Sequence, residues 1–108
     1  MLPFFAFYHK GGFPMFDNKR DLTHGISTTS PPPLQASLWN LIDLLPPERD
    51  YLQVFWLKPF GGMQQVIHTS EEPEYKKVLL FPSDNPINAK IYIIDDDDHT
   101  TMLLAEEY

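Results

Sequence analysis

The sequence has no cysteine and few basic residues. Because cysteine is absent from all 108 residues, disulfide bonds, cysteine-ligated zinc and thiol catalysis are excluded. Eight Lys and Arg residues stand against fifteen Asp and Glu residues, which gives a formal net charge of -7. Proteins bind nucleic acid mainly by neutralising phosphates with Lys and Arg, so this balance argues against nucleic acid, and equally against an anionic membrane, as the partner.

Long apolar runs are also lacking. No stretch approaches the roughly 20 apolar residues that a membrane-spanning helix needs. The first fourteen residues, MLPFFAFYHKGGFP, are aromatic, but their one base, Lys10, follows the apolar run instead of preceding it as in a secretory signal. We therefore expect a cytoplasmic protein that neither crosses nor binds a membrane.

The codons implied by residues 10–12 indicate another origin for this segment. They can read AAAGGAGGA, a bacterial ribosome-binding sequence, and two codons then separate it from Met15. Our hypothesis is that residues 1–14 are a non-native extension, translated from upstream DNA, and that residues 15–108 form a single domain. The alternative is an aromatic segment that packs on the domain.

The hydrophobic pattern predicts one main helix. Apolar residues recur at helical spacing from Leu34 to Leu45 and form one stripe that must be buried. We expect Ser30 to cap this helix and Pro46 to end it.

The other segments have the composition of strands. Alternating or β-branched and aromatic runs predict strands at 20–28, 51–58, 63–69, 76–81, 89–94 and 100–105. Two glycines predict a hairpin between the second and third of these, and residues 70–75 are expected to be a connection with one helical turn. The fold class that follows is α+β, a single domain with a mostly antiparallel sheet of five to six strands and one main helix packed on one face.

Large aromatic residues are expected to dominate the core: Trp39, Phe55, Trp56 and Tyr92. The strand at 51–58 has large apolar groups on both faces, as a central strand covered on both sides would have. On this basis Trp56→Ala is expected to cost about 3 to 5 kcal/mol.

Four aspartates and a histidine separate the last two predicted strands. Adjacent carboxylates repel one another and tend to attract a cation, which makes Asp96, Asp98 and His99 candidate ligands for a divalent metal. The simpler interpretation is a solvated hairpin tip, because consecutive side chains point in alternating directions and only about two face one ion.

The carboxyl-terminal end is also a candidate contact surface. Residues 95–108 carry six acids and no base, and Asp95, Asp97, Glu106 and Glu107 are the candidate contacts for a basic protein partner. Self-association through an edge strand is the alternative contact. A third interpretation is that the charge serves solubility alone.

Catalytic motifs are not found. The sequence contains no GxSxG, GxxxxGK, GxGxxG or HExxH, and we assign no catalytic residue and no cofactor. We predict a non-enzymatic protein that acts through protein-protein contacts. The alternative is a divalent-metal-binding protein or small metal-assisted hydrolase that uses residues 95–99.

Four segments carry a resemblance to a known family. They are LQASLWNLID at 34–43, DYLQVF at 50–55, HTSEEPEY at 68–75 and IDDDDHTTMLLAEEY at 94–108. From Met15 onward the chain is similar to a staphylococcal-type family of small proteins of unknown function from Gram-positive bacteria. The resemblance implies a cytoplasmic bacterial domain that begins near Met15, and it transfers no activity, cofactor or functional residue.

Overall fold

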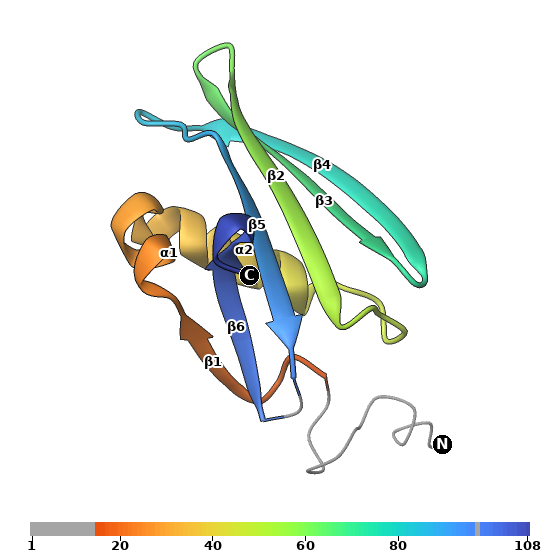
Figure 1. Ribbon diagram of the computed structural model, residues 1–108. Coiled ribbons are helices and arrows are strands. Elements are labelled where there is room, and N and C mark those ends of the chain that lie inside the picture. Colours follow the sequence, from red (N-terminus) through yellow and green to blue (C-terminus); the bar gives the residue numbers. More distant parts are fainter. Residues whose placement is uncertain (1–14, 97) are drawn as a thin grey trace.

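The computed structural model describes residues 15–96 and 98–108, so the proposed extension at residues 1–14 lies outside the described residues. The elements in chain order are β1 (Lys19–Leu22), α1 (His24–Thr29), α2 (Pro32–Asp43), β2 (Leu52–Phe60), β3 (Met63–Glu71), β4 (Glu74–Pro82), β5 (Ala89–Asp95), β6 (His99–Leu104) and the 3-10 helix η2 (Ala105–Glu107), as Figure 1 shows. The predicted α+β class, with one sheet and one main helix, is confirmed.

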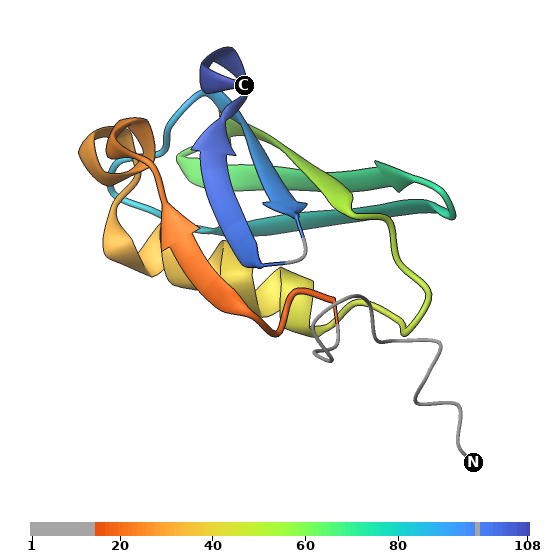
Figure 2. The same ribbon diagram turned by 60° about the horizontal axis from the view of Figure 1, so that its bottom comes forward.

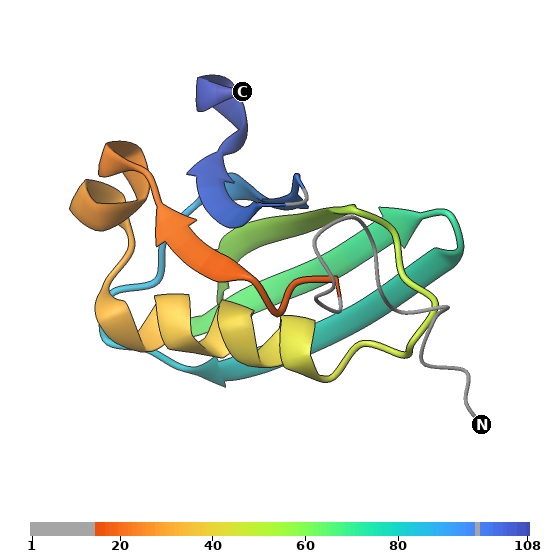
Figure 3. The same cartoon turned by 90° about the horizontal axis from the view of Figure 1, so that it is seen from below.

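The six strands form one sheet in the order β1-β6-β5-β2-β3-β4. All neighbours are antiparallel except β1 and β6, which are parallel. In Figures 2 and 3, α2 lies along one face of the sheet, whereas η2 and the C-terminus lie on the other side. The sheet therefore has a face covered by α2 and a face turned away from it.

The predicted apolar stripe of α2 closes the core. Its buried residues are Leu34, Leu38, Leu41 and Ile42. They belong to the same core cluster as the inward side chains of the sheet, which include Phe55, Leu57, Val66, Ile91, Ile93 and Met102. Since each such side chain contributes about 1.5 to 3 kcal/mol when it leaves water, this one face supplies most of the hydrophobic stabilisation.

The segment predicted as a strand at 20–28 changes structure halfway, so that prediction was wrong beyond Leu22. The hydroxyl of Thr23 accepts a hydrogen bond from the Ile26 N–H at 3.3 Å and begins α1 there. Ile26 is the one buried residue of α1. The sequence pattern fits either a strand or a short helix with one buried apolar residue. The hydrogen bond to the Thr23 hydroxyl stabilises the helix.

Ser30 ends α1 and does not cap α2, so the predicted cap was wrong. Its N–H donates to the Ile26 carbonyl at 2.9 Å. The N-cap of α2 is Pro31, which makes no side-chain hydrogen bond. Prolines in the first turn remove backbone donors that would otherwise need a cap, so the helix begins without one.

Residues 70–75 form a tight hairpin instead of a connection with a helical turn. Glu71 of β3 pairs directly with Glu74 of β4. The N–H of Glu72 donates to Asp50 Oδ2 at 2.9 Å, and the other oxygen of Asp50 accepts from the Leu52 N–H at 3.1 Å. A carboxylate from the preceding loop therefore holds this turn, which the local sequence does not reveal.

Of the four aromatic residues expected to dominate the core, Phe55 alone is completely buried. Trp39 and Tyr92 are half-buried, and Trp56 is 46% exposed. Trp56 points away from α2, because successive side chains of a strand alternate between faces. The prediction that β2 is covered on both sides, with Trp56 in the core, was wrong.

A chain of buried polar groups links β2 to β3. The Gln53 amide nitrogen donates to the Asp50 carbonyl at 2.8 Å, which leaves its oxygen to accept from His68 Nε2 at 2.7 Å. The His68 ring stacks on Phe55 with 4.3 Å between ring centroids and meets the edge of Tyr75 at 5.0 Å. Burial, assisted by the charge of Lys77, lowers the pKa of His68 from 6.5 to about 4.

Substitutions at two adjacent residues of β2 are expected to differ in their effect on stability. Phe55→Ala leaves a cavity and should cost about 3 to 5 kcal/mol. Trp56→Ala removes a half-exposed ring and one hydrogen bond, from its Nε1 to Thr69 Oγ1 at 3.3 Å, and should cost less than about 1.5 kcal/mol. Urea unfolding measures both free energies, and equal losses would place both rings in the core.

The buried His68 should make stability fall with acid. Its pKa is lower in the folded protein than in the unfolded chain, so the unfolded chain binds the proton more readily as pH falls below 6.5 towards 4. At about 1.36 kcal/mol per pKa unit, His68 destabilises the fold by about 3 kcal/mol at the acid end of this range. Urea unfolding of the parent and of His68→Gln at several pH values isolates this contribution. Parallel pH curves would contradict it.

Candidate binding surface

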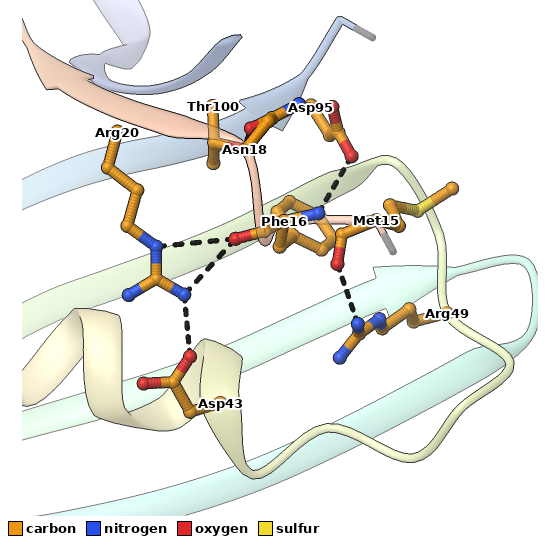
Figure 4. Close-up of polar contacts among 8 residues, drawn as sticks. All are labelled: Met15, Phe16, Asn18, Arg20, Asp43, Arg49, Asp95 and Thr100. Atoms are coloured by element: carbon orange, nitrogen blue, oxygen red, sulfur yellow. Dashed lines mark hydrogen bonds and ion pairs between the residues drawn. The ribbon is translucent and has the colours of Figure 1, made fainter. Parts of the chain in front are cut away.

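Asp95, a candidate contact residue, lies inside the molecule. It is 6% exposed, and its carboxylate accepts hydrogen bonds from the Phe16 N–H at 2.8 Å and from Asn18 Nδ2 at 3.0 Å (Figure 4). The Thr100 hydroxyl bonds to the side-chain oxygen of the same asparagine. This carboxylate fastens the segment before β1 to the end of β5, so it serves the fold and is not presented to a partner.

Two arginines hold the same segment from the other side. Arg20 donates to the Phe16 carbonyl through Nε at 3.3 Å and Nη2 at 3.2 Å, and to Asp43 Oδ1 at 2.5 Å (Figure 4). Arg49 Nη2 donates to the Met15 carbonyl at 2.6 Å. These contacts hold Phe16 fully buried at a φ of 71°, a backbone region that bulky residues seldom adopt. The arginines are therefore used within the fold.

Glu107, another candidate contact residue, is bonded to α1. Its carboxylate accepts from Thr23 Oγ1 at 2.6 Å, the Gly25 N–H at 3.2 Å and the Leu104 N–H at 2.9 Å, and these hydrogen bonds, the one from Thr23 foremost, lower the pKa of Glu107. A Cβ atom at Gly25 would lie 2.5 Å from the Glu107 Oε2 atom, so glycine permits this approach. Of the four candidate contact residues, Glu106 and Glu107 are exposed, and Asp97 lies outside the described residues.

The candidate metal ligands lie at the tip between β5 and β6. Asp96 Oδ1 accepts a hydrogen bond from the His99 N–H at 3.0 Å, and the His99 Nε2 atom is 3.9 Å from Asp21 Oδ2. Asp98 is exposed at the same tip. Within residues 15–96 and 98–108, no three or more His, Asp or Glu side chains gather so that they could hold a metal ion.

The side of the sheet turned away from α2 is a surface that sequence reasoning missed. In register, Trp56 of β2 lies beside Ile67 of β3, which lies beside Val78 of β4, and Lys90 of β5 flanks Trp56 on its other side. Large apolar side chains are unusually exposed here: Trp56 46%, Phe60 53%, Val78 51% and Leu80 43%. We call this surface the open face and define it by the outward residues Val54, Trp56, Lys58, Phe60, Gln65, Ile67, Thr69, Lys76, Val78, Leu80, Lys90 and Tyr92.

A cleft of about 470 Å³ lies on the open face beside Trp56. The side chains that line it are Trp56, Ile67, Lys58, Lys76, Gln65, Thr69 and Asn88, together with parts of Leu57 and Ala89. Lys90 Nζ is 4.3 Å from the centroid of the Trp56 ring and 5.5 Å from that of Tyr92. The cleft thus combines an apolar, aromatic wall with cationic and amide groups, and its lining holds no carboxylate or imidazole.

The part of the open face around the cleft is basic although the chain as a whole is acidic. Lys58, Lys76 and Lys90 lie on it, and none of them forms an ion pair with another residue in the described part of the chain. Alternation along β3 and β4 brings Glu71 and Glu74 to this side at the hairpin turn. Around the cleft itself the charges are therefore positive.

The architecture defines a small α+β domain with one sheet face that is uncovered over β2, β3 and β4, whereas Tyr108, after η2, contacts Tyr92 of β5. The helices of the described residues include none long and apolar enough to cross a membrane. The chain belongs to the family described as "Staphylococcal protein of unknown function" (DUF960), whose model matches residues 19–107. This confirms the family resemblance of the sequence. The crystal structure of a protein of unknown function from Enterococcus faecalis is similar, with a TM-score of 0.78 and 25% identity over 89% of this chain and 97% of that chain. No curated protein matches the chain.

Proposed function

We propose that this protein is a cytoplasmic, non-enzymatic binding protein and that its protein partner binds the open face. The observation that carries the proposal is the exposure of Trp56 beside an apolar cleft, with Phe60, Val78 and Leu80 exposed around it. Clustered exposed apolar side chains are typical of protein-protein interaction sites. Tryptophan is also among the residues that contribute most to binding energy at such sites.

The cleft is better suited to binding than to acid-base catalysis. General acids and bases are most often histidine or carboxylate side chains, and the lining of this cleft contains neither. Its polar groups are lysines, amides and the Thr69 hydroxyl, which accepts a hydrogen bond from Trp56. Such groups can orient a bound partner by hydrogen bonds and charge.

The acidic end has weaker support as the contact surface. The carboxylates of Asp95 and Glu107 are bonded within the fold. Among the described residues, this end offers a basic partner Glu106, Glu107, whose carboxylate already accepts three hydrogen bonds, and the exposed carboxylates of the hairpin tip. The open face adds the apolar cleft beside Trp56 to its charges, whereas charge alone mainly raises the rate of association.

Pairing of edge strands is a second form of contact that the sequence left open. β4 is the longer edge of the sheet, with nine residues, and β1 at the other edge has four. Lys76 and Lys77 are consecutive residues of β4. Lysines on an edge strand discourage pairing with another strand, so the face supports the proposal better than the edge.

Photo-crosslinking in the cells that make the protein tests this proposal. Benzoylphenylalanine at Leu80, on the open face, should give one dominant protein adduct, whereas the same group at Leu44, which is 59% exposed at the end of α2, should not. Adding Trp56→Ala should reduce the adduct at position 80 by at least about tenfold, since a central tryptophan contributes about 2 kcal/mol or more to binding and about 1.4 kcal/mol is a factor of ten.

Thermal unfolding of each variant should stay cooperative. This control shows that a weaker adduct does not result from loss of the fold. The same adducts in the same yield from both positions would contradict the proposal. So would the absence of any adduct from position 80 when the protein is present at its normal level.

A further inference from the structure

We infer that the partner presents an acidic segment whose bulky apolar side chain enters the cleft beside Trp56 while its carboxylates pair with Lys58, Lys76 and Lys90. The inference rests on the proposed function, because it names the chemistry of the partner for that same face. It is carried by Lys58 and Lys76, which line the cleft, and by Lys90, which lies over the Trp56 ring. None of the three forms an ion pair with another described residue.

The lysines lie on three sides of Trp56. Lys58 is two residues further along β2, about 7 Å away on the same face. Lys76 of β4 pairs with Thr69 of β3, and Thr69 pairs with Val54 of β2. Lys76 therefore lies level with Val54, two residues before Trp56, whereas Lys58 lies two residues after it. Lys90 pairs directly with Trp56 from β5. An apolar side chain in the cleft therefore has a cation within reach in each of these directions.

Charge complementarity selects the sign of the partner. The whole chain carries a net charge of -7, yet the three lysines around the cleft form no ion pair with other described residues. Lysines that keep their charge uncompensated beside an apolar cleft favour carboxylates and reject a basic segment by like-charge repulsion. Glu71 and Glu74, at the β3–β4 turn, mark where this basic region ends.

The aromatic rings also prepare one of the lysines for binding. Lys90 Nζ lies over the rings of both Trp56, at 4.3 Å, and Tyr92, at 5.5 Å. The attraction between ammonium and ring restricts this flexible side chain before a partner arrives. A carboxylate that meets it then loses less binding energy to the ordering of the side chain.

The cleft has the size of a side-chain pocket. Its volume of about 470 Å³ falls within the range of about 300 to 1,000 Å³ that is usual for small ligand sites. An aromatic or large aliphatic side chain with part of its backbone fits such a space. Together with the lysines on either side of Trp56, this size predicts a segment that has one bulky apolar residue with acidic residues on both sides.

Single-stranded nucleic acid is the competing class of ligand, because aromatic and lysine side chains on a sheet also bind bases and phosphates. A nucleic-acid strand carries a charge at every nucleotide and would extend beyond three lysines. Beyond the lysines, the strand would meet Glu71 and Glu74 at the β3–β4 turn in one direction and the acidic carboxyl-terminal end in the other. A short acidic protein segment avoids this repulsion.

Selection from a random library of displayed peptides tests the inference. The full chain is the target, and clones that also bind the Trp56→Ala chain are discarded. The retained peptides should be acidic around an aromatic or large aliphatic residue. Lys58→Glu combined with Lys76→Glu should weaken their binding at least about tenfold, whereas Lys19→Glu, on β1 away from the open face, should not change it. Urea unfolding confirms that each variant folds.

The outcomes separate the two proposals. Retained peptides that are neutral or basic would overturn the acidic partner and leave the open face as the binding surface. A selection that yields no Trp56-dependent peptide would count against the open face itself. A Trp56-dependent rise in the fluorescence anisotropy of labelled oligouridylate, stronger than that with the retained peptides, would overturn the inference in favour of nucleic acid.

Discussion

One twelve-residue helix packs against a sheet of six strands, and it covers only one of the two faces. The core therefore forms on the covered face, where Phe55, Ile91 and Ile93 are fully buried. The large apolar side chains on the other face keep their contact with water, and this constraint sets where a partner can bind.

The charged side chains also fall into two groups, those that are bonded within the fold and those on the open face. On the β1 and β6 side of the molecule, charged side chains are bonded within the fold: Asp95 to Phe16 and Asn18, and Glu107 to α1. On the open face, Lys58, Lys76 and Lys90, which come from β2, β4 and β5, form no ion pair with other described residues. An acidic protein thus exposes a basic, apolar surface, and its total charge misrepresents the part that is free to bind.

Periodicity in the sequence was enough to predict the helix with the Leu34 to Ile42 stripe and the strands from β2 to β6, because each has a period set by its own backbone. It failed for Trp56, since the pattern of a strand with two apolar faces is the same whether the second face is covered or open. It failed for Asp95 because nothing local separates this aspartate from its three neighbours. Its partners lie 79 and 77 residues away in the chain.

The candidate site could not be assembled from the sequence for the same reason. Lys58, Lys76 and Lys90 come from β2, β4 and β5. Only the register of β2 with β3 and β5, together with that of β3 with β4, places them around Trp56. Each lysine taken alone has the pattern of an ordinary solvated residue. The acidic run at 95–99 drew attention because its charges are adjacent in sequence, although the fold uses the first of them internally.

The most direct test of a partner-binding open face is a methyl NMR titration of the full chain with displayed peptides that were selected on the full chain alone, before any clone is discarded for binding the Trp56→Ala chain. We expect the methyl resonances of Ile67, Val78 and Leu80 to shift together, while those of Ile93, under α2, stay unchanged. Shifts that centre instead on Ile26 and the acidic carboxyl-terminal end, with Val78 and Leu80 unaffected, would contradict the open face as the place where this protein binds.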